Sequence, residues 1–407
     1  MKIKLLTISI LVILSLVLGA CAPAVAPTAP PAQVVKETVV VQTTKLVETT
    51  KLVEATKLVV ATQLVEKVVV ATPAPEEVNP YRPVQLFEIA AMLKKATEGK
   101  APPAGAKYAL LTNAVAPFWT AAAIGAQRAS AEINVPISFQ APTAADKLTQ
   151  QLSMLETMVA DKYNAITFSS IDRKAPASII KDAISKGISV LNTDSDATGS
   201  ERYIYVGMSD YDAGKIAGEA AKKIVVKGKM VGLVGYATAQ NAQDRIAGFK
   251  DAIKGSDITL EEVLLDDIKP EVALSNAQTA MQKYPDLAGF ITLYSYDGPA
   301  AGQAVKAAGK TGQVKVVAFD AEPETQRLME EGVVQVMIGQ RVYFYGYLTG
   351  YLMNAFTILG KDATMKLLEP YLDGDPKTRL NTGVDVIYAD SFPKYKEYLN
   401  SIGIPSQ

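Results

Sequence analysis

The chain contains no histidine, although it is 407 residues long. This absence removes the commonest general acid or base near neutral pH and the commonest metal ligand. It excludes serine and cysteine hydrolase triads that depend on histidine, as well as zinc sites built on imidazole. Chemistry with two carboxylates remains available, but the composition favours binding over catalysis.

Cysteine is almost absent as well: the one residue, Cys21, ends the run LGAC after a short apolar segment. Residues 5–17, preceded by Lys2 and Lys4, are too few to span a bilayer but suit a secretory signal. The run resembles the lipobox of bacterial lipoproteins, in which the cysteine receives a lipid. We expect a lipoprotein signal peptide over residues 1–20; an ordinary signal peptide with an incidental cysteine is the alternative.

A lipidated Cys21 would place the protein outside the cytoplasm. We expect an exported protein that the lipid anchors to the bacterial cell membrane, facing the periplasm or the exterior. No thiol would then remain for a disulfide, so packing must supply the stability.

Neither sign of charge dominates the chain. Removal of the signal peptide would leave 39 basic and 42 acidic side chains, a net charge of about −3. This balance provides no basic field for nucleic acid and no polybasic patch for a membrane. Residues 194–205 begin like a calcium loop, but Tyr205 stands where a bidentate glutamate is required. We therefore predict no nucleic-acid partner, no metal and no cofactor.

The segment 21–82 does not have the pattern of a folded core. A six-residue repeat runs from Thr44 to Glu66, and this period matches neither a heptad nor a helical multiple. We interpret the segment as a flexible spacer that follows the lipid, with a self-associating β or helical stalk as the alternative. Residues 83–106 are predicted to be a linker whose helix, over 83–98, docks on the body through an apolar stripe.

The body from residue 107 alternates short apolar runs, rich in Val and Ile, with helical patterns. One helical stripe begins at Leu148 and follows Thr143 and Asp146, which are spaced as a capping box. Near-continuous apolar strands between helices indicate parallel sheets that are covered on both faces. The number of units predicts an α/β fold with two doubly wound lobes. The strand candidates are 108–113, 165–169, 188–193, 229–235, 288–293 and 314–319.

Polar and aromatic residues stand where these strands stop, and ligands of such sheets bind at the carboxyl ends of the strands. Asp194 follows one strand and Asp320 another. A carboxylate there can accept hydroxyl hydrogen bonds worth roughly 1.5–3 kcal/mol each. Phe118 and Trp119 begin a helix after the first strand, where packing within the lobe is the alternative to ligand contact. A single such residue is more often a helix cap, but the repetition favours a ligand site.

Five motifs together resemble the type I periplasmic sugar-binding proteins of the ribose-binding-like branch, which are solute receptors of ABC importers. The likeness covers roughly residues 107–400. The motifs are APFW at 116–119, NTDS at 192–195, VGMSDYDAG at 206–214, AFD at 318–320 and GQ at 339–340.

The resemblance implies a clamp of two lobes joined by a three-segment hinge. The chain would cross near Ser209-Asp210, near Gln340-Arg341 and near Gly383. The N-terminal lobe would comprise 107–209 plus 341–383, and the C-terminal lobe 210–340 plus 384–407.

The resemblance also implies roles for single residues. Aromatic faces would sandwich a sugar ring, two carboxylates would bind its hydroxyls, and further polar groups would complete the contacts. The implied ligand-binding residues are Thr112, Phe118, Trp119, Asp194, Ser195, Gln243, Arg245, Tyr294, Asp297, Asp320 and Gln340.

Three departures from the family pattern argue against plain ribose recognition. Ser195 stands where the ribose binders carry arginine, and Ala116 stands where they carry asparagine. Either Tyr294 or Asp297 replaces another asparagine. The pocket would suit another pentose, a hexose or a polyol.

The leading hypothesis is a monomeric receptor that closes around a monosaccharide and delivers it to an ABC permease in the membrane. The alternative is a sugar sensor that presents its closed form to a chemoreceptor or sensor kinase. A glycosidase using Asp194 and Asp320 is a third possibility. A transcription regulator of this fold is excluded by the signal peptide and the missing DNA-binding helices. Without histidine, we expect nearly constant affinity between about pH 6 and 8.

Overall fold

The computed structural model describes residues 79–236 and 239–405. The described residues belong to one compact unit. The expected signal peptide, the lipidation site at Cys21 and the six-residue repeats lie outside the described residues.

The first sheet has seven strands in the order β11-β12-β5-β4-β3-β1-β2. All neighbouring pairs are parallel except β11 and β12. Its central strands are buried along their whole length, as expected for a sheet covered on both faces. The strands are β1 (Tyr108–Leu111), β2 (Ile137–Gln140), β3 (Ala165–Phe168), β4 (Ser189–Thr193), β5 (Ile204–Gly207), β11 (Leu372–Asp373) and β12 (Arg379–Asn381).

The second sheet has six strands in the order β13-β10-β9-β8-β6-β7. Only the pair of β10 and β13 is antiparallel. All six strands expected from the sequence are present in the two sheets, which confirms the prediction of two doubly wound lobes. The strands are β6 (Lys227–Val234), β7 (Asp257–Leu265), β8 (Leu287–Thr292), β9 (Lys315–Phe319), β10 (Val336–Gln340) and β13 (Val384–Tyr388).

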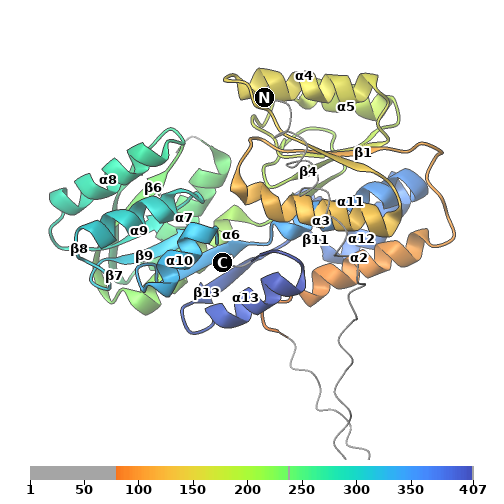
Figure 1. The fold of residues 1–407 in the computed structure, drawn as a ribbon. Coiled ribbons are helices and arrows are strands. Elements are labelled where there is room, and N and C mark those ends of the chain that lie inside the picture. Colours follow the sequence, from red (N-terminus) through yellow and green to blue (C-terminus); the bar gives the residue numbers. More distant parts are fainter. Residues whose placement is uncertain (1–78, 237–238, 406–407) are drawn as a thin grey trace, which may run out of the picture. The chain divides into compact units, whose positions relative to one another are not determined.

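Helices cover both faces of each sheet (Figure 1). On the first sheet, α4 and α5 pack on one face, and α3 and α11 pack on the other. On the second sheet, α6 and α7 cover one face, and α8, α9 and α10 cover the other. The helices are α3 (Thr120–Ile133), α4 (Lys147–Ala160), α5 (Ala177–Ser185), α6 (Asp210–Ile224), α7 (Gln240–Ile253), α8 (Pro270–Lys283), α9 (Asp297–Ala307), α10 (Pro323–Glu330), α11 (Tyr343–Leu359), α12 (Lys361–Leu368) and α13 (Phe392–Ser401), with 3-10 turns η1 (Pro117–Trp119) and η2 (Glu369–Tyr371).

The helix expected over 83–98 is α2 (Val84–Thr97), and it packs on α11. Leu86, Ile89 and Leu93 are buried in the main core cluster, and the Phe87 ring lies edge to face with Phe344, 5.0 Å between centroids. The capping box before α4 was a wrong prediction. Asp146 is the N-cap and accepts a hydrogen bond from the Thr149 N–H, because helix α4 starts only at Lys147.

Helices α3 and α11 approach so closely that only glycine fits at their crossing. A Cβ atom on Gly346 would lie 1.9 Å from the Ala122 carbonyl oxygen. The close approach of the two helices packs α11 against the first sheet, and α11 is buried over most of its length. None of the helices in the described part of the chain is long and apolar enough to cross a membrane.

The chain passes between the two sheets three times, after β5, after β10 and after β12. The three passages match the three-segment hinge of the predicted fold class. Arg341 ties two of them together, because its guanidinium donates to the Thr382 carbonyl (2.9 Å) and pairs with Asp385 (2.8 Å). The carboxyl ends of the parallel strands therefore face one another across the hinge.

Candidate functional site

In the first lobe, Asp194 directly follows β4 and has left-handed backbone geometry, with φ at +61°. Ser169, at the end of β3, donates its hydroxyl to Asp194 Oδ2 (2.7 Å), and Asn113 Nδ2 lies 3.5 Å from the same oxygen. The Tyr205 hydroxyl donates to the Asp194 backbone carbonyl (2.8 Å). Burial raises the pKa of Asp194 from 3.8 to about 6, although the Ser169 hydrogen bond and the Arg245 charge oppose this shift.

In the second lobe, Asp320 follows β9 with a similar backbone, φ +67°, and only 5% of the residue is exposed. The Gln340 side chain hydrogen-bonds to the carboxylate, but Asp320 Oδ1 has no partner among the described residues. Burial raises the pKa of Asp320 from 3.8 to about 7, against the opposing effects of Arg245 and Gln340. An unpaired buried acceptor is uncommon in native proteins and invites a donor from outside the chain.

A buried guanidinium acts on both carboxylates. Arg245, on α7, is 3% exposed and pairs through Nε with Asp210 Oδ1 (2.8 Å). Its Nη1 donates to the Leu293 carbonyl (2.6 Å), and its guanidinium lies 4.7 Å from the centroid of the Phe319 ring. Its charge lowers the pKa of Asp194 and of Asp320, partly offsetting the effect of burial. Each lobe thus supplies one buried carboxylate, and the charge of Arg245 acts on both.

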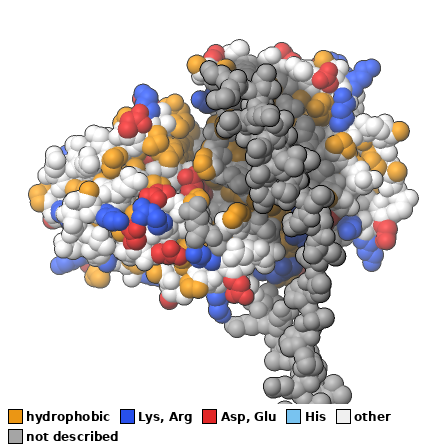
Figure 2. All heavy atoms as spheres, in the orientation of Figure 1, with side chains coloured by type: hydrophobic (Ala, Val, Ile, Leu, Met, Phe, Trp, Pro, Cys, Tyr) orange, Lys and Arg blue, Asp and Glu red, His pale blue; other side chains and the backbone are white. Residues whose placement is uncertain are grey.

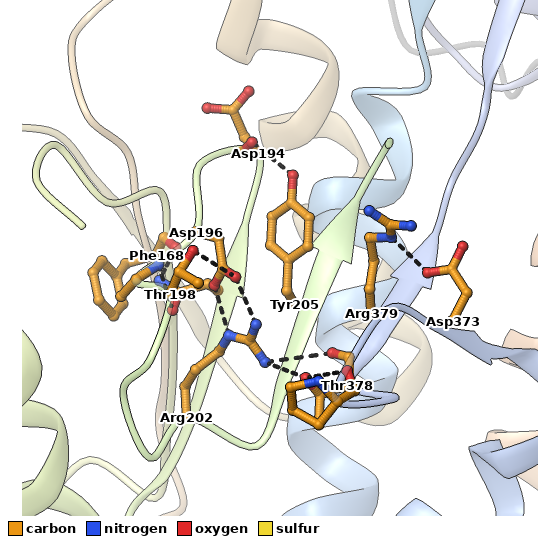
Figure 3. A network of polar contacts seen from close by, with 12 residues as sticks. Phe168, Asp194, Asp196, Thr198, Arg202, Tyr205, Asp373, Thr378 and Arg379 are labelled. Atoms are coloured by element: carbon orange, nitrogen blue, oxygen red, sulfur yellow. Dashed lines mark hydrogen bonds and ion pairs between the residues drawn. The ribbon is translucent and has the colours of Figure 1, made fainter. Parts of the chain in front are cut away.

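Each of the two carboxylates lines a cavity. The larger, of about 760 Å³, is lined by Asp194 and Ser195 from the first lobe and by Asn241 from the second. The smaller, of about 240 Å³, is lined by Phe118 from the first lobe, with Asp320 and Gln340 beside it. Figure 3 shows the wall of the larger cavity, with Tyr205 pointing toward Asp194.

The arrangement suits a neutral ligand rich in hydroxyl groups. Carboxylates and an amide oxygen accept from hydroxyls, and Phe118 offers an apolar face. Among the described residues, no group of three or more His, Cys, Asp or Glu side chains is placed to hold a metal ion. On the face shown in Figure 2, acidic and basic side chains are interspersed rather than gathered by sign.

The periplasmic binding protein domain matches residues 108–362, which is more than half of the chain. This protein belongs to that family. The range contains the Asp194, Asp320, Arg245 and Gln340 side chains described above. It is a family of binding proteins, so membership does not support the glycosidase hypothesis.

Proteins of known name agree with this membership. The D-ribose/D-allose-binding protein of Pseudomonas aeruginosa is 28% identical over 46% of this chain, and the match spans 60% of its own length. The D-allose-binding periplasmic protein of Escherichia coli K12 is 24% identical, over 58% of this chain and 80% of its own length. Among solved structures, GanP, a glucose-galactose binding protein from Geobacillus stearothermophilus, superposes with a TM-score of 0.62 at 26% identity, covering 71% of this chain and 99% of GanP.

Five of the eleven ligand-binding residues expected from the sequence line the two cavities. Asp194 and Ser195 line the larger one, and Phe118, Asp320 and Gln340 line the smaller. Arg245 and Tyr294 line neither cavity, but the Tyr294 hydroxyl donates to Asn241 Oδ1 (3.2 Å), and Asn241 lines the larger one. The remaining four residues, Thr112, Trp119, Gln243 and Asp297, line neither cavity.

The aromatic pair does not form two parallel walls. Phe118 and Trp119 lie edge to face, with an interplanar angle of 85° and 5.1 Å between ring centroids. Trp119 is 3% exposed, packs with Val342 and Tyr345, and donates its indole N–H to Asn113 Oδ1 (3.2 Å). Packing within the lobe, the alternative weighed for this pair, therefore describes Trp119 here, and its contact with a ligand stays a prediction.

Three other expected residues have partners of their own or face outward. The Thr112 hydroxyl donates to the Ala114 carbonyl (2.8 Å), and Gln243 is exposed on α7. Asp297 is fully buried at the start of α9, where it accepts a hydrogen bond from the Tyr294 N–H (3.1 Å). Burial and the neighbouring Asp266 carboxylate hold the pKa of Asp297 well above its usual value. Asp297 thus holds the backbone of the turn that follows β8.

The sequence reasoning missed four residues of the site: Ser169, Asn113, Asp210 and Tyr345. Ser169 and Asn113 end predicted strands, so their position was a usable signal. Asp210 stood in a quoted motif, but its pairing with Arg245 depends on the contact between α6 and α7. Tyr345 donates to Gln340 Oε1 (3.0 Å) from within an apolar run that gave no hint of this role.

The expectation of constant affinity between pH 6 and 8 stays a prediction, but the structure changes its premise. It rested on unperturbed pKa values, which leave no group titrating in that range. The structure places the pKa of Asp194 at about 6 and that of Asp320 at about 7. Two carboxylates of the site therefore change charge close to neutral pH.

Proposed function

We propose that this binding protein is an extracytoplasmic receptor that binds a monosaccharide and delivers it to an ABC importer. The observation that carries the proposal is that each lobe places a buried carboxylate at the end of a parallel strand, Asp194 after β4 and Asp320 after β9, and that the charge of Arg245 acts on both. Relatives named for ribose, allose, glucose and galactose support the ligand class. The departures at Ala116 and Ser195 favour a pentose other than ribose, a hexose or a polyol.

The mechanism is a clamp held shut by its ligand. One hydroxyl would donate to Asp320 Oδ1, which otherwise has no partner among the described residues. A second would donate to Asp194, whose Oδ2 is already held by Ser169. A ligand that contacts both lobes stabilises the closed state over the open one, and no covalent step is involved. Phe118 would cover one face of the sugar ring.

The proposal extends to how the protein is held. Lipid on Cys21 would anchor a monomer to the bacterial cell membrane, with residues 21–82 as the spacer and 83–106 as the linker. The lobes would comprise 107–209 plus 341–383 and 210–340 plus 384–407. The sheets support this division, because β1–β5, β11 and β12 form one sheet and β6–β10 and β13 form the other. The relatives do not favour the alternative of a sugar sensor.

The test is a calorimetric titration of residues 22–407, which lack only the signal peptide and Cys21. The panel comprises ribose, arabinose, xylose, glucose, galactose, allose and two polyols. We expect saturable binding of at least one, with a change in Trp119 fluorescence, since the indole is bonded to Asn113 beside Asp194. Absence of heat with every compound would contradict the proposal.

A further inference from the structure

We propose that Gln326 is a further specificity-determining residue of this protein, and that its Oε1 accepts a hydrogen bond from one hydroxyl of the bound sugar. This role deepens the proposed sugar-binding function and rests on it. Gln326 and Asp320 both line the smaller cavity. Each has a buried oxygen, Oε1 and Oδ1 respectively, that has no hydrogen-bond partner among the described residues.

A single connection of the second lobe supplies both oxygens. Asp320 directly follows β9, and Gln326 lies near the start of α10, where its backbone N–H donates to the Glu322 carbonyl (2.9 Å). Only 3% of Gln326 and 5% of Asp320 are exposed. Ligands of parallel sheets bind at the carboxyl ends of the strands, so both acceptors lie where a ligand is expected.

The orientation of the Gln326 amide follows from the partner of its nitrogen. Nε2 donates to the Ala321 carbonyl (2.7 Å), which can only accept. The nitrogen must therefore face Ala321, and Oε1 takes the other side of the planar amide. This leaves Oε1 buried without a donor, as is Asp320 Oδ1. Because buried acceptors without a partner are uncommon in native proteins, two of them in residues of one cavity indicate a ligand that supplies two donors.

The charged side chains of the smaller cavity favour a neutral ligand. Arg341 is the one cation among the described residues that line it, and it is occupied by the Asp385 carboxylate (2.8 Å) and the Thr382 carbonyl (2.9 Å). The other charged residues of the lining, Asp320, Glu322 and Asp385, carry carboxyl groups. A phosphate or carboxylate ligand would therefore meet acceptors instead of donors.

The size and the apolar walls of the smaller cavity suit one sugar ring. Its volume is about 240 Å³, below the roughly 300–1,000 Å³ of pockets for ligands of drug size. Apolar side chains form much of the remaining wall, among them Phe118, Leu399 and Ile402. A monosaccharide has apolar ring faces and hydroxyls at its edge, so it can use this wall and both acceptors together. Since the configuration of a ring carbon decides whether its hydroxyl reaches Gln326, the contact distinguishes epimers.

The test compares sugars with their monodeoxyfluoro derivatives, in which fluorine replaces one hydroxyl and removes its donor with little change in size. The probes are the sugars of the panel above and these derivatives, measured by calorimetry on residues 22–407. In the wild-type protein, we expect the derivative that lacks the donor to Gln326 to bind about tenfold more weakly than its parent sugar, in line with the loss of one hydrogen bond.

Gln326→Met removes the amide while keeping nearly the same side-chain length. It should weaken binding of the parent sugar about tenfold and bring that one derivative within twofold of the parent. The other derivatives should lose as much affinity in the variant as in the wild-type protein. If Gln326 only held the backbone at Ala321, the parent and all derivatives would instead weaken by one common factor.

Gln335→Met is the matched control. Gln335 also donates its amide to a backbone carbonyl, that of Gly332 (2.8 Å), but its Oε1 accepts from the Val316 N–H (2.8 Å) and it lines neither cavity. This variant should change no affinity by more than twofold. Gln326→Asn covers the case in which Gln326→Met fails to fold. Its side chain is shorter by one methylene, so it should show the same selective loss.

The role of Gln326 and the proposed function fail in different ways. If every fluorine substitution costs the same affinity in the Gln326 variants as in the wild-type protein, Gln326 does not contact the sugar, and the proposed function stands. The same conclusion follows if no derivative binds more weakly than its parent sugar in the wild-type protein. If the wild-type protein binds no compound of the panel, both proposals are wrong.

Discussion

Each lobe places an aspartate at the end of a parallel strand, but the two carboxylates differ in their hydrogen-bond partners within the protein. Asp194 and Asp320 each follow a parallel strand, and their φ angles are +61° and +67°. Asp194 is held by Ser169 and approached by Asn113 from its own lobe. Asp320, in contrast, keeps a buried Oδ1 without a partner in the described part of the chain.

We call Asp194 the prepared carboxylate, because a side chain of its own lobe already orients it, and Asp320 the unfinished one, because one of its oxygens has no hydrogen-bond partner among the described residues. A buried acceptor without a partner costs about 1–3 kcal/mol, which a donor from outside can restore. The first lobe can therefore hold a sugar before closure, whereas the second lobe gains most when the sugar completes its hydrogen bonds. The ligand-dependent part of closure should then depend chiefly on Asp320.

The largest expected effect comes from removing the charge at each carboxylate in turn. Asp320→Asn should weaken sugar binding at least a hundredfold, because the amide offers the sugar a weaker acceptor beside Arg245. The same change should raise the free energy of unfolding at pH 8, since it removes a buried charge whose oxygen is unpaired. Asp194→Asn should lose similar affinity but gain less stability, because Ser169 already stabilises that carboxylate. Calorimetry and thermal melting measure both quantities.

The pH profile checks the cause of that gain. Burial raises the pKa of Asp320 to about 7, so the folded protein binds a proton more tightly than the unfolded chain, where the value is 3.8. The contribution of Asp320 to wild-type stability should accordingly fall as pH rises from about 4 to about 7. The advantage of Asp320→Asn should be absent near pH 4, grow over this range and then level off. A constant advantage at every pH would point to packing instead of charge.

A second effect, about tenfold, is expected in the affinity of the wild-type protein between pH 5.5 and 8. Affinity should rise with pH, because sugar hydroxyls donate more strongly to ionised Asp194 and Asp320, whose pKa values are about 6 and 7. Calorimetry at half-unit pH steps gives the curve. In Asp194→Asn, the remaining rise should centre near pH 7. A flat wild-type curve would instead restore the expectation drawn from composition.

The sequence could anticipate these carboxylates because parallel strands bring their carboxyl ends to one edge, and buried strands are readable as apolar runs. The sequence could not anticipate which side chains near the strand ends point away from the cavities. Trp119 follows the first strand as expected, yet its indole bonds to Asn113 inside the lobe. On α7, Asn241 lines the larger cavity, whereas Gln243, two residues further along the helix, is exposed. Such choices depend on tertiary packing, which the local pattern does not encode.

A smaller effect should follow from loosening the prepared contact. Ser169→Ala removes the hydroxyl that donates to Asp194 Oδ2 at 2.7 Å. We expect sugar affinity to fall about fivefold to twentyfold, which is less than the full loss of a hydrogen bond to a charged group, because Ser169 acts on the sugar only through Asp194. Ser170→Ala is the matched control, because the Ser170 hydroxyl donates to the Asp172 carbonyl and not to Asp194. Equal losses in the two variants would show a general effect on the loop after β3.

The smallest effect is expected where the lobes touch without a ligand between them. Arg173→Gln should weaken monosaccharide binding only about twofold to threefold, because an exposed hydrogen bond competes with water and contributes little. The loss should be in the dissociation rate, since Arg173 of the first lobe reaches Gln240 of the second only when the lobes meet. Stopped-flow fluorescence of Trp119 separates the two rates, and Arg128→Gln, on an exposed face of α3, is the matched control. If Arg173→Gln weakened binding as much as Asp320→Asn, direct contact between the lobes would hold the clamp shut. The difference between Asp194 and Asp320 would then not explain how the ligand closes the clamp.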